Sequence, residues 1–322
     1  MTIRKKVILD VDTGVDDALA IMLAVKSGAL DILGITTVNG NVSLDQATEN
    51  TCKILQFLGV QDEIPVHRGA DKPLTREVHF EHRVHGRDGI GGALAEMVVN
   101  KRAEEESAAD FIIRQVTSQP GEITLIMTAP LTNLAEVLQK CPELVQHTAE
   151  VIIMGGVVRG SGNITPTAEY NIYVDPEAAK LVMGAGFPHL TLVGLDVTRK
   201  ALLSQEDIAK LTNPEIAAYV EQSTADYRQR YYERNGVAAC ALHDPLAVGV
   251  AINPDLVTKL DYYVDVETRS ELCDGQTVCD FQNRLNQPHN VSVCLEVDDP
   301  AFLKLFIGSL NQELKTGREF TQ

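Results

Sequence analysis

The fold of this chain is decided close to its amino terminus, by residues 7–23 with the sequence VILDVDTGVDDALAIML. The first residues are mostly apolar and β-branched, as in a strand that is buried on both faces. Gly14 permits a turn, and Asp16 and Asp17 then begin an amphipathic helical stretch, since acidic side chains in a first turn suit the helix dipole. A second apolar run follows at 32–38, and a right-handed crossover makes the two strands parallel. The segment therefore predicts a β-α-β unit.

The same alternation of apolar strands and helical periods continues along the chain. Strands are predicted at 64–66, 123–127, 151–154 and 190–194, with helices at 44–58, 107–117, 131–138 and 176–183. After residue 204 we expect helices at 216–234 and 244–252, strands at 261–266, 277–281 and 291–297, and a last helix from Pro300. No repeat or Pro-rich linker divides residues 1–322. We therefore expect one α/β domain: a mostly parallel, Rossmann-like open sheet flanked by helices, with a more helical C-terminal half.

Composition narrows the classes of function. The formal charge of −17 opposes binding to nucleic acid or to an anionic membrane surface, and fits a neutral or cationic small substrate or a metal ion. There is no run of about 18 apolar residues, and the amino terminus lacks the apolar core of a secretory signal. The six cysteines are scattered without a Cys-x-x-Cys pair. We therefore expect a cytoplasmic protein with free thiols.

Four carboxylates, those of Asp10, Asp12, Asp16 and Asp17, crowd the junction between the first strand and its helix. In open α/β sheets ligands bind at this junction, at the carboxyl ends of the strands. Like charges packed this closely repel one another unless a cation or a shared proton compensates them. Ligation by oxygen alone points to a hard cation, Ca²⁺ or Mg²⁺, rather than zinc. The plainer alternative is a solvated acidic turn that caps the helix.

Further motifs follow this one in the chain: VNGN at 38–41, HGRDG at 85–89, TAPLTN at 128–133, MGG at 154–156, GNITPTAEYN at 162–171 and HDP at 243–245. Together with D-x-D-x-G-x-D-D from Asp10 to Asp17, they resemble the motifs of the inosine–uridine-preferring nucleoside hydrolase family, in the family's order. The resemblance covers essentially the whole chain. It implies hydrolysis of the N-glycosidic bond of a ribonucleoside to free base and ribose, by a homodimer or homotetramer.

The resemblance also implies a Ca²⁺ site. Its ligands would be Asp12, Asp17, the backbone carbonyl of Thr128, and Asp244. Waters and ribose hydroxyls would complete the roughly six to eight oxygens that Ca²⁺ prefers. One metal-bound water would attack C1′, with Asp12 as the general base. Asp10 would orient these ligands from behind.

Contacts to the ribose and the base are implied in the same way. Those to the ribose would come from Asp16, Asn41, Met154, Asn163, Glu169 and Asn171. His243 would protonate the leaving base, since His carries a proton near neutral pH, and His85 would reach the base edge. Each has a structural alternative, because Asn beside Gly is often a turn residue and a lone His before a helix is often structural. The preferred base and the base contacts from 228–242 are left open.

Two other functions share some of these residues. The D-x-D-x-T opening of a haloacid dehalogenase-type Mg²⁺ phosphohydrolase resembles residues 10–13 and would make Asp10 a covalent nucleophile. That function leaves the motif at 162–171 and the His243-Asp244 step unexplained. A Ca²⁺-dependent ribonucleoside-binding protein without turnover would use the same site. The presence of both Asp12 and His243 favours an enzyme.

Overall fold

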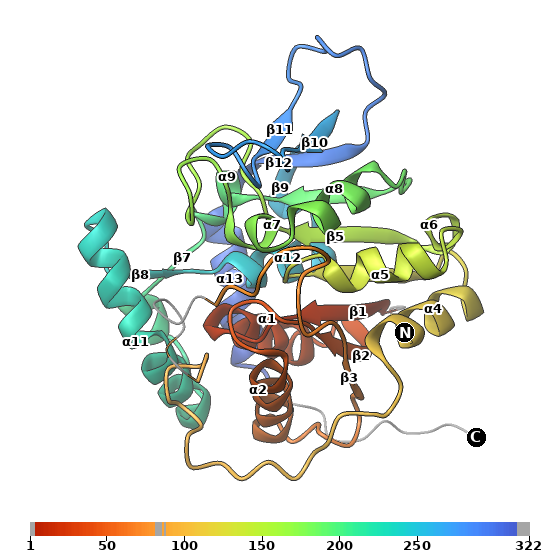
Figure 1. The fold of residues 1–322 in the computed structure, drawn as a ribbon. Helices are drawn as coiled ribbons and strands as arrows, with labels where there is room; N and C mark the ends of the chain where they lie inside the picture. Colours follow the sequence, from red (N-terminus) through yellow and green to blue (C-terminus); the bar gives the residue numbers. More distant parts are fainter. Residues whose placement is uncertain (1–3, 81–85, 87, 314–322) are drawn as a thin grey trace.

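The structure, a computed structural model, describes residues 4–80, 86 and 88–313. Its centre is an eight-stranded sheet with the strand order β3-β2-β1-β4-β5-β6-β12-β9 (Figure 1). The strands are β1 (Lys5–Val11), β2 (Leu30–Thr37), β3 (Val66–Arg68), β4 (Ile123–Met127), β5 (Glu150–Met154), β6 (Leu190–Val193), β9 (Val257–Tyr262) and β12 (Val291–Val297). Neighbouring strands are parallel except β9 and β12, which are antiparallel. The predicted α/β fold with a mostly parallel sheet is confirmed.

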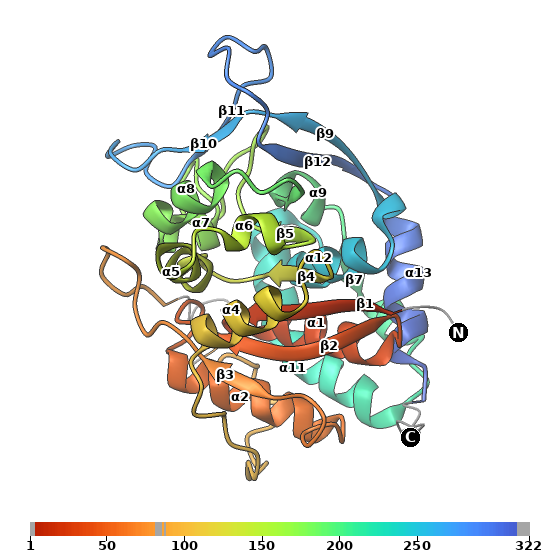
Figure 2. The ribbon, with the colours of Figure 1, turned by 90° about the vertical axis from the view of Figure 1, so that its right-hand side faces the viewer.

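Helices cover both faces of the sheet, and each covering layer has its own apolar core (Figure 2). The first layer holds α1 (Val15–Lys26), α2 (Leu44–Phe57), α12 (His243–Ile252) and α13 (Asp299–Leu310). The second holds α4 (Ala108–Ser118), α5 (Thr132–Lys140), α6 (Leu144–His147) and α8 (Pro176–Gly184). Alternate residues of β1 supply the two cores, Leu9 the first and Ile8 the second. Burial on both faces explains why this strand is apolar throughout.

The remaining elements lie mostly in the second half of the chain. They are α7 (Tyr170–Val174), β7 (Leu202–Ser204), α9 (Leu195–Thr198), α10 (Gln205–Ile208), α11 (Pro214–Asn235), β8 (Ala239–Ala241), β10 (Val264–Val266) and β11 (Thr277–Cys279), with a short 3-10 turn at Pro254–Leu256. The long helix α11 stands at one side of the molecule, away from the sheet (Figure 1). Two small sheets, β7-β8 and β10-β11, were not predicted as pairs, because strands of three residues carry no readable alternation.

Two local predictions were wrong. The stretch 18–26 was expected to be amphipathic, but every residue of α1 except Val25 is buried, because this helix contacts both α12 and α13. The strand expected at 261–266 is two strands that belong to different sheets, β9 ending at Tyr262 and β10 beginning at Val264. The side chain of Asn290 accepts a hydrogen bond from the Val264 amide (2.8 Å) and donates to its carbonyl (2.9 Å), which ends the ladder of the large sheet there.

The strand order reverses between β1 and β4, and this places the functional site. The chain leaves β1 for β2 on one side, whereas β4, β5 and β6 build outward on the other. In a doubly wound sheet the crevice at such a reversal, outside the carboxyl ends of the strands, binds ligands. The carboxyl ends of β1 and β4 are joined by a hydrogen bond, in which the amide of Thr128 donates to the carbonyl of Asp10 (2.9 Å).

Two further expectations concern the whole chain. All six cysteines have free thiols, as the sequence predicts. Among the described residues no helix is both long and apolar enough to cross a membrane.

Candidate active site

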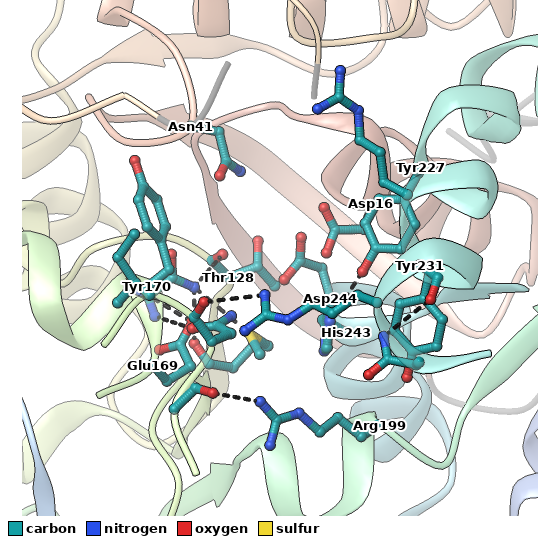
Figure 3. A pocket seen from close by; sticks show the side chains of 18 of the residues that line it. Asp16, Asn41, Thr128, Glu169, Tyr170, Arg199, Tyr227, Tyr231, His243 and Asp244 are labelled. Atoms are coloured by element: carbon teal, nitrogen blue, oxygen red, sulfur yellow. Dashed lines mark hydrogen bonds between the residues drawn. The ribbon is translucent and has the colours of Figure 1, made fainter. Parts of the chain in front are cut away.

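A pocket of about 360 Å³ opens at the carboxyl ends of the central strands (Figure 3). Its walls include eight of the predicted site residues: Asp16, Asn41, Thr128, Met154, Asn163, Glu169, Asn171 and Asp244. His243 lines it as well. These residues come from six separate segments of the chain, so their meeting in one cavity is a property of the fold and not of local sequence. His85, the remaining predicted base contact, lies outside the described residues.

Three carboxylates, of which those of Asp16 and Asp244 line the pocket, form a cluster that we name the floor. One oxygen of each of Asp16, Asp17 and Asp244 lies within 4.8 Å of the others, and all three side chains are buried. Asp16 and Asp17 begin α1, whereas Asp244 stands in the first turn of α12. Asp16, expected to bind ribose, therefore belongs to this cluster, alongside the two expected metal ligands.

Asp12 lies against the cluster, held by the turn after β2. Its Oδ2 accepts a hydrogen bond from the amide of Asn41 (2.5 Å), and its Oδ1 accepts one from Asn41 Nδ2 (3.1 Å). Asn41 Nδ2 also donates to Asp17 Oδ2 (3.2 Å). Gly40 makes this approach possible, because a Cβ at that position would lie 2.0 Å from Asp12 Oδ2. Asn41 thus forms part of the turn and also donates side-chain hydrogen bonds to the carboxylates of Asp12 and Asp17.

Asp10 sits behind the floor and is absent from the pocket wall. Its Oδ1 accepts hydrogen bonds from Asn133 Nδ2 (2.7 Å) and from the Thr36 hydroxyl, which come from α5 and β2. The side chain is fully buried. This is the position of a residue that braces the site from behind. It also argues against Asp10 as the nucleophile of a phosphohydrolase, which needs access to the substrate.

Burial makes the charged forms of these acids costly. It raises the pKa of Asp10 and of Asp16 to about 7, with repulsion from Asp17 adding to both shifts. Burial and the neighbouring carboxylates also raise the pKa of Asp12 and Asp244 well above its ordinary value. Among the described residues, no Lys or Arg forms an ion pair with Asp10, Asp12, Asp17 or Asp244. A buried set of carboxylate oxygens of this kind has the chemistry of a site for a hard divalent cation.

The wall opposite α12 is built around Glu169, the N-cap of α7. Its carboxylate accepts hydrogen bonds from the amides of Gly156 (2.9 Å), Asn171 (3.0 Å) and Ile172 (3.3 Å). Burial raises its pKa to about 7, although these three bonds oppose the shift. Asn171 Nδ2 donates to the carbonyls of Thr128 (3.0 Å) and Met154 (3.2 Å). The wall is therefore pre-formed, with its polar atoms fixed by the backbone.

Asn163 is the half-buried member of this wall. Its Oδ1 accepts a hydrogen bond from the Tyr170 amide (2.9 Å), and the residue lines the pocket. The Tyr170 hydroxyl in turn donates to the carbonyl of Gly40 (2.8 Å), joining this wall to the turn that holds Asp12.

His243 stands on the opposite side of the pocket, as the first residue of α12. Its Nδ1 lies 2.7 Å from the buried hydroxyl of Thr198, at the end of α9, and its Nε2 lies 3.3 Å from the Tyr227 hydroxyl on α11. The ring of Tyr227 stacks on that of Tyr231, with 6.2 Å between the centroids. These contacts fix the imidazole beside two aromatic rings, where a planar base would fit.

The sequence reading missed part of this side. Tyr227 and Arg230 line the pocket together with Tyr231 and Arg234, and Arg199 joins them from the end of α9. The first four are spaced i, i+3, i+4 and i+7, so that they share one face of α11. That spacing was a usable signal, although it commonly marks a core-facing stripe. In the segment 228–242, whose base contacts were left open, Tyr232 is exposed and does not line the pocket.

Comparison with known proteins shows the family to which this chain belongs. Residues 7–304 match the model of the inosine-uridine preferring nucleoside hydrolase family. The pyrimidine-specific ribonucleoside hydrolase RihB of Escherichia coli (strain SE11) is 35% identical over 318 residues, which cover 97% of this chain and 99% of that protein.

Solved structures give the same result. A plant nucleoside hydrolase, the PpNRh1 enzyme, superposes with a TM-score of 0.90 at 33% identity, covering 96% of this chain and 99% of that one. The purine-preferring ribonucleoside hydrolase from Gardnerella vaginalis has a TM-score of 0.88 at 34% identity, covering 95% of this chain and 98% of that one. The chain therefore belongs to the inosine–uridine-preferring nucleoside hydrolase family, whose members are hydrolases that act on N-glycosyl bonds.

Proposed function

We propose that this protein hydrolyses the N-glycosidic bond of ribonucleosides in a Ca²⁺-dependent reaction, giving free base and ribose. The observation that carries the proposal is the meeting of Asp16, Asp17 and Asp244 in one buried cluster, with His243 beside it in the same pocket. An acid cluster alone would suit many metal sites. A cluster with a histidine and two aromatic rings across the cavity suits the cleavage of a sugar from a planar base.

Calcium would be held by Asp12, Asp17, Asp244 and the Thr128 carbonyl. The donor set fits, because all four groups offer oxygen and the three carboxylates are buried without a basic partner among the described residues. When bound, such a cation lowers the pKa of a coordinated water and so makes a nucleophile available near neutral pH. Asp16 is close enough to this set to contact either the cation or a ribose hydroxyl.

Side chains of the protein would carry out the proton transfers and bind the ribose. Asp12, fixed by Asn41, takes the proton of the attacking water. Glu169, Asn163 and Asn171 bind ribose hydroxyls, and such bonds strengthen as positive charge develops on the sugar. His243 gives a proton to the leaving base, from the nitrogen that faces Tyr227. Asp10 braces the floor through Thr36 and Asn133.

Base preference does not follow from kinship, since relatives of similar identity are named as pyrimidine-specific and as purine-preferring. We place the activity in the cytoplasm, supported by the six free thiols, and expect one domain over residues 1–322 that assembles as a homodimer or homotetramer.

The test is the release of free base and ribose from a panel of inosine, uridine, cytidine and adenosine, with Ca²⁺ and with a chelator. We expect turnover of at least one nucleoside with Ca²⁺ and its loss with chelator. Calorimetric binding of a nucleoside without any release of base would instead identify a ribonucleoside-binding protein. Release of phosphate from phosphomonoesters without cleavage of nucleosides would point to the phosphohydrolase.

A further inference from the structure

One peptide group, the one between Gly40 and Asn41, is hydrogen-bonded at both of its ends to side chains of the site. Its N–H donates to Asp12 Oδ2 (2.5 Å), and its C=O accepts a hydrogen bond from the Tyr170 hydroxyl (2.8 Å). The described residues contain no cis peptide bond, and in a planar trans peptide the C=O and the N–H point in opposite directions. The Tyr170 hydroxyl, the peptide group and the Asp12 carboxylate therefore form one continuous series of hydrogen bonds.

Tyr170 takes part in the site in two separate ways. It is the first residue of α7, it is buried, and it lines the pocket on the same side as Asn41 and Glu169 (Figure 3). Its backbone amide donates to Asn163 Oδ1 (2.9 Å) and so holds the wall around Glu169. Its hydroxyl instead reaches the turn beside Asp12. A change of the hydroxyl alone therefore separates the two roles.

The Tyr170 hydroxyl has two acceptors within reach but only one proton to donate. The second acceptor is the carbonyl of His79, at 3.0 Å. His79 is exposed, so that water can bond to its carbonyl, whereas Gly40 is buried. A buried carbonyl without a partner is costly. The bond to Gly40, which is also the shorter of the two, is therefore the one that matters for the fold of this turn.

The turn around the peptide group depends on such a bond. The amide of Asn39 donates to the carbonyl of Ala70 (3.0 Å), and the amide of Gly40 donates to the carbonyl of Val42 (3.1 Å). Both bonds belong to the neighbouring peptide groups and leave the one between Gly40 and Asn41 to be oriented by its own partners. Glycine permits a wide range of backbone angles, so the residue before this group does little to fix it. The Tyr170 hydroxyl supplies the restraint on its C=O side.

Hydrogen bonds in such a series strengthen one another, because a donor to the C=O polarises the peptide group and makes its N–H a better donor. We propose that Tyr170 is a positioning residue for Asp12. Its hydroxyl holds the peptide group between Gly40 and Asn41, and the N–H of that group aims the Asp12 carboxylate at the attacking water. The inference rests on the proposed function, in which Asp12 is the general base, and adds a residue that acts on this base through the backbone.

Tyr170→Phe removes the hydroxyl and keeps the ring and the backbone bond to Asn163. At saturating Ca²⁺ we expect kcat to fall by the same factor for every nucleoside that the protein cleaves, about 5- to 30-fold, as for the loss of one buried hydrogen bond. KM should change by about threefold at most, because the wall around Glu169 stays in place. Tyr173→Phe is the matched control. Tyr173 lies on the same helix and contacts the ring of His79 but does not line the pocket, so this variant should change neither value.

A second measurement does not depend on turnover. In ¹H–¹⁵N NMR spectra of the whole protein without nucleoside, the Asn41 amide proton should lie downfield, as expected for a short bond to a carboxylate. Tyr170→Phe should move it upfield, because its bond to Asp12 weakens when the peptide group is no longer polarised. An Asn41 amide proton that stays in place while kcat falls would show that the hydroxyl acts through His79, and this result would overturn the proposal.

Two kinetic outcomes would overturn it as well. A rise in KM at unchanged kcat would assign the hydroxyl to ribose binding. A lower melting temperature with unchanged kcat and KM would leave the hydroxyl a purely structural role. Failure of the proposed function would look different, since the wild-type protein would then release no base, while the position of the Asn41 amide proton would still test the series of hydrogen bonds from Tyr170 to Asp12.

Discussion

The two ends of the pocket are built in opposite ways. The floor and its supporting residues are buried side chains that follow β1, β2 and β4 or begin α12, and hydrogen bonds from Asn41 and Thr128 hold Asp12 and Asp17. The base side consists of longer side chains on α11 and just after α9, of which Arg199 and Tyr231 are half-buried and Arg230 and Arg234 are exposed. A rigid floor suits the part of the reaction that all ribonucleosides share. An adaptable side suits the part in which substrates differ.

The ends also differ in charge. The floor and its neighbours Asp10 and Asp12 bring five acids together, and the base side brings three arginines together. Buried like charges are costly unless a charge of the opposite sign compensates them, so the acids favour a cation at the floor. The comparison predicts that changes at the floor affect every substrate, whereas changes at Arg199, Arg230 and Arg234 affect selected ones.

The largest effect is expected at the floor. Asp17→Ala and Asp244→Ala should each lose Ca²⁺ binding and lower kcat for every nucleoside by about 10³-fold or more, since a catalytic cation supplies several kcal/mol and each 1.36 kcal/mol is tenfold. Calorimetry with Ca²⁺ and a base-release assay measure the two losses. Asp45→Ala removes an exposed carboxylate of α2 and serves as the control. Wild-type turnover without bound metal in either variant would remove that residue from the ligand set.

A smaller effect is expected at His243, which stands between the two ends. His243→Ala should lower kcat for natural nucleosides by about 10²–10⁴-fold, the worth of a positioned acid, while leaving Ca²⁺ affinity largely unchanged. The loss should shrink for a p-nitrophenyl riboside, because p-nitrophenolate departs without a proton. The measurement is the ratio between the loss in kcat for natural nucleosides and the loss in kcat for the p-nitrophenyl riboside. A merely structural histidine, holding Thr198 and Tyr227 in place, would slow both substrates equally.

The contrast between the ends explains what the sequence could predict. The floor was readable because its acids are adjacent in sequence and follow an apolar strand, and because Asn41 and Thr128 follow strands that end at the same edge. The parallel sheet then brings them together without further information. The family resemblance assigned Asp16 to the ribose, and its carboxylate also lies in the cluster with Asp17 and Asp244.

The base side could not be read in the same way. Arg199 reaches the pocket only because α9 ends beside the start of α12, a contact that depends on how the layers pack. Tyr227 and Arg230 lie on a helix with a mixed polar surface, and their spacing marks one face of the helix without showing whether that face meets the pocket or the core. The break between β9 and β10 was missed for a related reason, since it depends on Asn290, far along the chain.

The ribose end can be tested by removing one hydroxyl from the substrate. A 2′-deoxynucleoside leaves buried polar partners unsatisfied, which costs about 1–3 kcal/mol per group, or roughly 5- to 150-fold in kcat/KM. We expect 2′-deoxyuridine to be poorer than uridine by at least that factor. Arg199→Gln should leave this ratio unchanged, because it lies at the other end of the pocket. Equal kcat/KM for the two nucleosides would contradict the assignment of Glu169 and Asn171 to the ribose.

The smallest effect concerns stability, and it distinguishes the two ends without catalysis. In the folded protein the pKa values of Asp10, Asp16 and Glu169 are raised to about 7 by burial, compared with ordinary values of 3.8 for Asp and 4.5 for Glu. The folded state therefore binds more protons than the unfolded state between these values, and its free energy of unfolding falls as pH rises from about 4 to about 7. Above pH about 7 these acids are ionised in both states, and the free energy of unfolding no longer falls for this reason.

Calcium should oppose this loss, because a cation at the floor favours the ionised acids. The chelated protein should therefore have a lower melting temperature at pH about 7 than at pH about 5, and Ca²⁺ should raise it more at the higher pH. At a concentration of 100 times Kd the gain in unfolding free energy is about 2.7 kcal/mol. Thermal denaturation with Ca²⁺ and with chelator measures it. Arg199→Gln should keep the same dependence on pH and metal, since its charge is exposed to the pocket and pairs with no floor acid. A chelated protein that became more stable as pH rose would show that the floor acids are compensated within the chain, and the two ends would then not differ in the way described.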